Sequence, residues 1–339
     1  MPLPWPRQRS STSLQLLLQL GLDHGLDPAS CLHGTGLDPA QIAAMPGQID
    51  SGSELQLIDN LVQALPHHPD LGLQAGRRYR LTTYGAWGYA LLSSATAREA
   101  AELGLRYLGL TYAFSRISLS EASDQASLHF DCEAVAEPLQ PFIVQRDMLG
   151  AVVVTRELLG SALPLARLQL RQAAPSDTTA WCEAFGRTPE FAAGCNRLDF
   201  AASLLDAPLP LANPRLVQAC EQQCRAILNR HQWHEGLTGQ VRRLLLQAPA
   251  QTTDMEHVAA CLHISSRTLR RRLSAQGSSF RALQDEIRQA LAEELLAAGG
   301  ISLEEIAARL GYGELSNFIH AFKRCKGMTP GRYQHGERL

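Results

Sequence analysis

The sequence has no apolar run of about 20 residues, the length that a helix needs to cross a bilayer. Residues 1–22 contain a shorter apolar stretch that Gln15 and Gln19 interrupt, and no small-residue cleavage site follows it. We therefore predict a loose tail and a first helix over residues 1–20, with no signal peptide. We expect a cytoplasmic protein with no membrane partner.

Enzyme motifs are also missing. A nucleophile elbow, a Walker loop, a dinucleotide fingerprint and His-Glu-x-x-His do not occur in the 339 residues. His67 and His68 lie between prolines, where a surface turn is expected, and His231 and His234 lack a third ligand. We predict no catalytic residue, no metal site and no cofactor. An enzyme with an accessory binding domain is the hypothesis that the sequence supports least.

The eight cysteines contain no Cys-x-x-Cys pair. Cys220 and Cys224 are one helical turn apart, a spacing that suits a metal pair, but no second pair matches them. We interpret all eight as small buried apolar residues in a reducing cytosol. The other six are Cys31, Cys132, Cys182, Cys195, Cys261 and Cys325.

A large excess of either charge is absent, since the formal net charge is −2. The charges are nevertheless divided unevenly. Residues 237–339 hold 14 basic and 10 acidic residues, a net of +4, whereas residues 1–236 hold 17 and 23, a net of −6. A basic C-terminal domain on a weakly acidic body favours a polyanionic partner for that domain.

What the N-terminal part does contain is a mixture of helical and alternating patterns. The sequence GLDP occurs at 25–28 and 36–39, and Asp before Pro is typical of a helix start. We therefore predict an α+β domain over residues 21–213. Its helices are expected at 53–65, 96–114 and 143–160, its strands at 116–122, 126–133 and 167–173, and two further short strands within 189–200.

A Pro-rich connection at 204–214 leads into a predicted helix that we assign to residues 214–236. It is interpreted either as a connecting or dimerising helix or as a simple packing helix. The glycines at 236 and 239 end it, and we place the domain boundary there.

Residues 254–276 predict a first pair of short helices joined by a tight turn at 263–265. Thr253 and Glu256 fit a capping box, and Gly277 ends the pair. The second helix turns Arg267, Arg270 and Arg271 away from its apolar side. Such arginines often form only a solvated face. On the second helix of a pair, however, they fit a major groove about 12 Å wide.

The arrangement recurs over residues 303–326. Ser302 and Glu305 form a second capping box, Gly311 and Tyr312 turn the chain, and the next helix buries two phenylalanines. A last short helix begins at 329–330. The open face of the second helix offers Glu314, Ser316, Asn317 and His320, followed by Lys323 and Arg324.

A helix predicted at 280–298 lies between the two pairs. Its 19 residues span about 28 Å, close to the spacing of about 34 Å between successive major-groove faces. We therefore predict an all-α domain over 237–339, in which a long helix joins two helix-turn-helix units. A helical bundle without this function is the alternative.

The C-terminal domain resembles the DNA-binding domain of AraC/XylS-type transcriptional regulators. In the second unit the matching residues are Ile306, Ala307, Gly311, Tyr312, Ser316, Phe318, Phe322, Lys323, Gly327, Thr329, Pro330 and Tyr333. In the first unit they are Ile264, Ser265, Leu269, Arg271, Arg272, Leu273 and the segment 277–280. The resemblance implies base or phosphate contacts by the three arginines named above, and it adds Leu315 to the second recognition face. Leu315 and His320 depart from the family, which usually has a polar residue and Arg there.

The N-terminal part is similar to the arabinose-binding-like effector domain of one subgroup, through residues 36–43 and 185–214. That domain is α+β and not a jelly roll. The resemblance implies an activator that binds double-stranded promoter DNA, recruits RNA polymerase, responds to a small-molecule effector and forms a homodimer. A DNA-binding architectural protein without an effector is the second hypothesis.

An effector site is the feature that the sequence marks least. Residues 77–92 place Tyr84, Trp87 and Tyr89 beside two glycines, and aromatic residues near glycines can line a cavity. Ordinary core packing is the alternative for these three residues.

Overall fold

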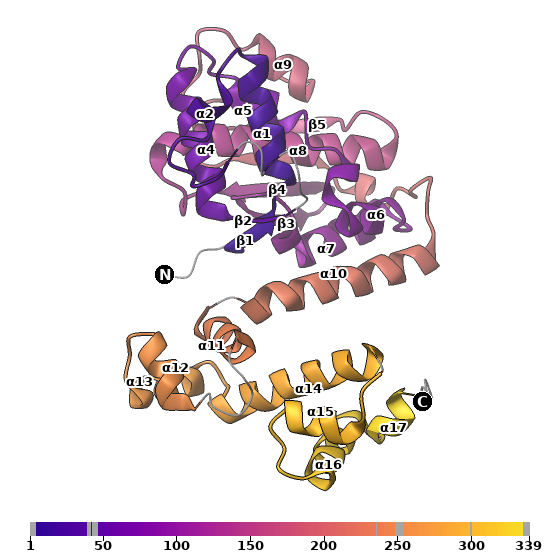
Figure 1. The fold of residues 1–339 in the computed structure, drawn as a ribbon. Coiled ribbons are helices and arrows are strands. Elements are labelled where there is room, and N and C mark those ends of the chain that lie inside the picture. Colours follow the sequence, from indigo (N-terminus) through magenta and orange to yellow (C-terminus); the bar gives the residue numbers. More distant parts are fainter. Residues whose placement is uncertain are drawn as a thin grey trace. The chain divides into compact units, whose positions relative to one another are not determined.

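The computed structural model of the protein describes residues 5–38, 42, 47–234, 236–247, 254–298 and 300–334. It divides into two compact units, Met1–Asn229 and Arg230–Leu339 (Figure 1). This division falls within helix α10 (Pro214–His234), before the predicted boundary at residue 236. Each unit is described by itself.

The first unit is an α+β structure, as predicted. Its helices are α1 (Thr12–Asp23), α2 (Pro28–Cys31), α4 (Ser51–Ala64), α5 (Leu71–Gly76), α6 (Ala86–Leu92), α7 (Ala97–Arg106), α8 (Gln140–Leu159) and α9 (Thr179–Phe185). Single 3₁₀ turns lie at Leu81–Tyr84, Leu108–Leu110, Glu137–Leu139 and Ala202–Asp206. Asp27 caps α2 by accepting the Ser30 N–H, which confirms the first predicted GLDP helix start. The helix expected after the second GLDP lies largely outside the described residues.

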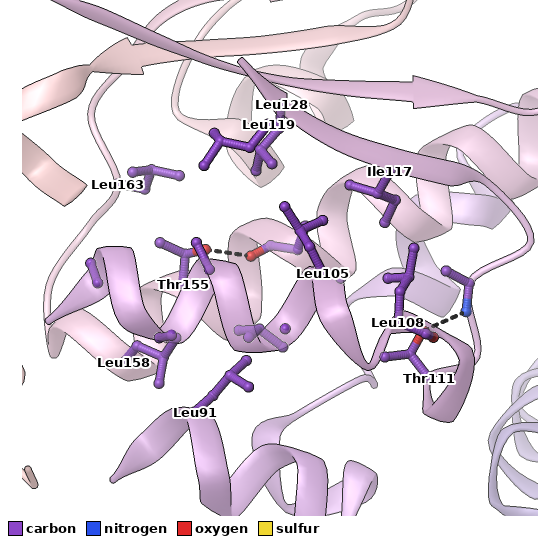
Figure 2. A pocket seen from close by; sticks show the side chains of 18 of the residues that line it. Leu91, Leu105, Leu108, Thr111, Ile117, Leu119, Leu128, Thr155, Leu158 and Leu163 are labelled. Atoms are coloured by element: carbon purple, nitrogen blue, oxygen red, sulfur yellow. Dashed lines mark hydrogen bonds between the residues drawn. The ribbon is translucent and has the colours of Figure 1, made fainter. Parts of the chain in front are cut away.

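Two antiparallel sheets complete this unit. β1 (Gln8–Ser10) pairs with β2 (Gln48–Asp50). The larger sheet has the order β3–β4–β6–β5, from β3 (Arg116–Ala122), β4 (Gln125–Asp131), β5 (Leu165–Gln169) and β6 (Arg197–Ala201). Leu119 of β3 lies opposite Leu128 of β4, and both side chains lie on the sheet face that looks toward the helices (Figure 2).

Two predictions in this region were wrong in extent. The helix expected at 96–114 ends at Arg106, where Tyr107 leaves the helical conformation, and Gly109 in the next turn weakens any continuation. Residues 189–200 contain one strand, not two. Glu190 makes only an isolated bridge to Gln169, and the positive φ of Ala192 (+54°) breaks the extended chain before a ladder can form.

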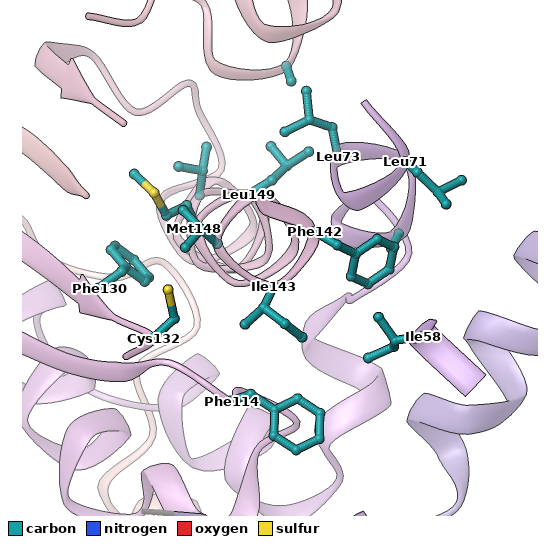
Figure 3. Packing of buried hydrophobic residues seen from close by; sticks show 14 of the residues in the cluster. Ile58, Leu71, Leu73, Phe114, Phe130, Cys132, Phe142, Ile143, Met148 and Leu149 are labelled. Atoms are coloured by element: carbon teal, nitrogen blue, oxygen red, sulfur yellow. The ribbon is translucent and has the colours of Figure 1, made fainter. Parts of the chain in front are cut away.

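Helix α8 is the centre of the first unit. It is buried on nearly all sides, which explains why its valine run forms a helix instead of a strand. Figure 3 shows Ile143, Met148 and Leu149 of α8 among side chains from the sheet and from α4 and α5. Helix α5 packs closely on α8 at Gly76. A Cβ at this position would lie 2.9 Å from the Arg146 carbonyl oxygen, so only glycine allows this approach.

Four charged side chains within this core interact with one another: Arg9, Glu54, Arg146 and Asp147, each at most 7% exposed. Glu54 accepts hydrogen bonds from Arg9 and from Arg146, both at 3.2 Å, and Arg146 pairs with Asp147 at 2.8 Å. A buried charge without a partner costs several kcal/mol. This set of two cations and two anions therefore ties β1, α4 and α8 together.

Helix α10 packs one face on the first unit. Val217, Cys220 and Cys224 are buried in a cluster with residues of α6 and α7, whereas Leu216 is 42% exposed. The packing interpretation of this helix is therefore confirmed for the face that carries the two cysteines. Cys31 and Cys132 are also buried, but Cys261 and Cys325 are exposed, so the expectation of eight buried cysteines was wrong.

The second unit is all α. Its helices are α11 (Gly236–Gln247), α12 (Met255–Cys261), α13 (Ser266–Ala275), α14 (Phe280–Ala298), α15 (Leu303–Arg309), α16 (Leu315–Lys326) and α17 (Pro330–Gln334). One hydrophobic cluster joins α11, α12, α13 and the first half of α14, and another joins the second half of α14 with α15 and α16. In neither unit does a described helix combine the length and the apolar character needed to cross a bilayer.

Candidate nucleic-acid interface and ligand cavity

The first candidate recognition helix is α13. The Ser265 hydroxyl caps it by accepting the Thr268 N–H at 3.2 Å. Leu269 and Leu273 are fully buried on one side, as predicted. The opposite side carries three exposed guanidinium groups, of Arg267, Arg270 and Arg271.

The turn before α13 sets the angle at which this helix leaves α12. His263 takes a positive φ of +54°, and its N–H donates to the Ala260 carbonyl. Histidine tolerates this conformation better than most residues. Helix α12 is capped by Asp254, which accepts the His257 N–H at 2.7 Å, so the prediction of Thr253 as the cap was one residue early.

The second candidate recognition helix is α16. Gly311 supplies the positive φ (+78°) of the preceding turn, and Tyr312 packs 5.6 Å from Phe318 between ring centroids. Phe318 and Phe322 are buried, and Gly327 ends the helix in the left-handed conformation. These features agree with the predicted roles. The Ser302 hydroxyl caps α15, but the Glu305 carboxylate pairs with Arg309 at 2.6 Å.

The exposed residues of α16 and its N-cap include the predicted polar and basic ones. They are Glu314, Ser316, Asn317, His320, Lys323 and Arg324. Leu315 differs, because it is half-buried and packs against the core of this half of the unit. Packing explains why an apolar residue stands where the family usually has a polar one. Among the described residues, no exposed cation of these two helix faces has a carboxylate partner except Lys326, which is bound to Glu293 at 2.8 Å.

Helix α16 is fixed to α14 by a small polar and aromatic clamp. Glu293 of α14 accepts from Lys326 and from the Tyr333 hydroxyl at 3.3 Å. The ring of Tyr333 lies 5.4 Å from that of Phe322, and the Arg288 guanidinium lies 5.7 Å from the centre of Tyr312. The recognition helix is therefore held on the long helix at its start and at its end.

A cavity of about 150 Å³ lies within the first unit. Figure 2 shows it between α7 and α8 on one side and the sheet on the other, with Leu91 of α6 at its edge. Aliphatic side chains supply most of its wall: Leu105, Leu108, Ile117, Leu119, Leu128, Leu158 and Leu163 are among them.

Two of the three predicted effector residues line this cavity. Tyr84 and Trp87 do so, and the Trp87 indole N–H donates to the Gly104 carbonyl at 3.2 Å. Tyr89 is 49% exposed and lies outside the lining, because helix α6 turns it to the opposite side from Trp87. The lining residues from α8 and from the sheet were not predicted from the sequence. The small pair Gly150 and Ala151 within a bulky apolar helix was the available signal.

Comparison with known proteins agrees with both parts. Residues 25–209 match the family described as the arabinose-binding domain of AraC transcription regulators, and residues 258–336 match a helix-turn-helix domain. The chain is 30% identical to an uncharacterized HTH-type transcriptional regulator of Mycobacterium tuberculosis, over 98% of each chain. It is 32% identical to the ornithine utilization regulator of Pseudomonas aeruginosa, over 94% of each.

A further relative, the HTH-type transcriptional regulator VirS of M. tuberculosis, is 29% identical over 78% of each chain. The N-terminal match alone covers more than half of the 339 residues. The chain therefore belongs to the AraC-type family of helix-turn-helix transcriptional regulators.

Proposed function

We propose that the protein activates transcription by placing α13 and α16 in major grooves of promoter DNA, under the control of a small molecule bound in the first unit. The observation that carries this proposal is the pair of exposed faces with unpaired cations, each backed by its own core on α14. Arginine and lysine side chains left free on such helices fit phosphate oxygens and guanine edges.

The individual contacts belong to the same proposal. Arg267, Arg270 and Arg271 act from α13, and Lys323 and Arg324 act from α16. In this scheme the basic side chains bind phosphates or guanines, Glu314 accepts from cytosine N4, and the neutral polar side chains contact base edges. Glu314 is oriented in part by Ser316, which donates to it at 3.3 Å.

The regulatory side of the proposal rests on the cavity and on the family. A domain with an open apolar cavity suits a small-molecule effector, and activation through RNA polymerase follows from the family resemblance. The relatives are named as regulators, which supports the expectation that the protein catalyses no reaction. It would act as a homodimer in the cytoplasm, where promoter DNA is accessible.

The test begins with duplexes enriched from a random library by the full-length protein. Gel shifts then compare wild type with Arg270→Glu and Arg271→Glu, which place a carboxylate against the phosphates. We expect binding to the enriched duplex to fall about 100-fold or more. The matched control is Arg116→Glu, an exposed position on β3 of the first unit that makes the same change in net charge.

Unchanged binding by both α13 variants, with circular dichroism like that of wild type, would refute the placement of this recognition helix. Loss of binding by the Arg116 variant as well would show that net charge alone decides affinity. An in vitro transcription assay on the enriched site, with RNA polymerase present, separates activation from passive binding.

A further inference from the structure

We infer that the cavity of the first unit takes an uncharged, mainly aliphatic ligand of about six to eight non-hydrogen atoms that carries one polar group. The ligand is neither a sugar nor an organic anion. This inference deepens the proposed effector site and rests on it. It departs from what the description of the matching family, an arabinose-binding domain, suggests.

The size of the ligand follows from the cavity volume. An apolar cavity of 150 Å³ holds a molecule of about the size of benzene. The half-buried side chains of Ile117, Leu119 and Leu128 face it from the sheet, and Leu105 faces it from α7 (Figure 2). These side chains keep apolar surface in contact with the cavity, and an aliphatic ligand would bury that surface.

A sugar does not fit, because all but one of the polar side chains of the lining already have hydrogen-bond partners. The Thr111 hydroxyl donates to the Leu108 carbonyl at 2.7 Å, and the Thr155 hydroxyl donates to the Ala151 carbonyl at 2.8 Å. Asp147 accepts two backbone N–H groups and the Arg146 guanidinium. The several hydroxyls of a pentose would mostly lack partners, and each such buried group costs about 1–3 kcal/mol.

An anion does not fit either. Of the residues that the structure describes, no Lys, Arg or His lines the cavity, and the charged group that does is the Asp147 carboxylate. A carboxylate ligand would therefore lose its hydration without gaining a counter-ion, and it would lie near a like charge. A cation would gain from Asp147, but that carboxylate already has Arg146 as its partner at 2.8 Å.

One polar group of the lining stays available, the hydroxyl of Tyr84. Within the described part of the chain it makes no hydrogen bond, and it lies 3.9 Å from the position of a Cβ at Gly150. Burial raises the pKa of Tyr84 well above its ordinary value, so the hydroxyl keeps its proton and can donate. A ligand oxygen placed there would satisfy it, which accounts for the single polar group.

The experiment measures the melting temperature of the full-length protein with four six-carbon or five-carbon probes: 1-hexanol, hexanoate, hexylammonium and L-arabinose. We expect 1-hexanol to raise the melting temperature of the first unit by about 5–10 °C at 100 times its Kd. The other three probes should leave it within 1–2 °C, by the arguments on charge and hydroxyl groups above.

Two variants locate the binding. Tyr84→Phe removes one hydrogen bond, so it should raise the Kd of 1-hexanol about fivefold. Benzene, a fifth probe that cannot accept this bond as an alcohol does, should bind the variant and the wild type alike. The matched control is Tyr89→Phe, which removes a hydroxyl from an exposed ring and should change neither Kd. Ala151→Leu fills the cavity and should abolish stabilisation by both probes.

The inference is overturned if arabinose or hexanoate stabilises the protein as much as 1-hexanol, or if no probe binds. It is also overturned if Tyr84→Phe and Tyr89→Phe bind 1-hexanol alike. A protein that fails these tests but still binds its enriched duplex keeps its role as a DNA-binding regulator and loses only this ligand assignment. Loss of duplex binding by the wild type would instead refute the proposed function.

Discussion

The salt dependence of DNA binding provides a quantitative test of the proposed interface. Removing one cation from a recognition helix should reduce the steepness of that dependence by a fixed amount, because each phosphate contact releases condensed counter-ions from the DNA. Arg271→Ala in α13 and Lys323→Ala in α16 are the two perturbations, one for each helix. Both side chains are exposed, and neither has a carboxylate partner among the described residues.

The magnitude follows from the number of free cations on the two faces. Five of the cations assigned to DNA contacts are exposed and have no carboxylate partner in the described part of the chain: Arg267, Arg270, Arg271, Lys323 and Arg324. If each meets one phosphate, the slope of log affinity against log salt is about −4.5, since each contact contributes about 0.9. Between 50 and 200 mM salt the wild-type affinity then falls about 500-fold, and that of either single variant falls about 150-fold.

Fluorescence anisotropy with a labelled random-sequence duplex measures this slope without knowledge of the natural promoter. Arg116→Ala, on the first unit, is the control and should keep the wild-type slope. A flat salt response of the wild type would contradict the whole interface. A slope that Arg271→Ala changes but Lys323→Ala does not would remove α16 from the phosphate contacts and leave α13 in place.

Two further predictions concern the first unit. Glu54→Gln leaves two buried arginines with one carboxylate, so we expect the free energy of unfolding to fall by about 3–5 kcal/mol and the melting temperature in calorimetry to fall by roughly 6–20 °C. The control Glu133→Gln, which removes one member of an exposed ion pair, should change neither quantity appreciably. A fall of less than 2 °C for Glu54→Gln would contradict the role of the buried cluster. Burial raises the pKa of the Cys132 and Cys224 thiols to about 11, above their values in the unfolded chain. Their contribution to the free energy of unfolding is therefore fully present below about pH 8.5 and falls as the pH rises toward 11, by up to about 1.4 kcal/mol per pH unit for each thiol. Urea unfolding at pH 8 and pH 10 measures this loss, which Cys132→Ala should reduce; equal stability at both pH values would show that the thiols ionise freely in the folded protein.

The local signals in the sequence account for most of the second unit. A helix of this unit is specified by residues a few positions apart: Ser265 caps α13, and Phe318 and Phe322 define the buried side of α16. The turn at Gly311 is equally local. For the same reason the error at the start of α12 was small, since Asp254 has the same capping chemistry as its neighbour.

The first unit was predictable only in part, because its decisive contacts are distant in sequence. The absence of a second strand within 189–200 depends on Ala192, whose positive φ no alternation pattern indicates. The cavity was less predictable still. Its wall joins residues of α7, α8 and the sheet. Tyr84 lines the cavity from the 3₁₀ turn before α6, whereas Tyr89 lies on the exposed side of α6. The pattern of aromatic residues near glycine correctly indicated Tyr84 and Trp87 as lining residues. It also indicated Tyr89, because the pattern does not show which side of a helix faces the cavity.

Helix α14 joins the cores behind the two candidate recognition helices. Leu283 and Ile287 belong to the core behind α13, Ala292 and Leu296 belong to the core behind α16, and Leu291 packs against both. Each helix-turn-helix alone has a very small core, and such cores are marginally stable by themselves. Sharing one long helix gives each a larger apolar surface to bury. Because both cores are built on the same helix, the packing that stabilises them also fixes the separation of the two proposed DNA-binding faces along α14.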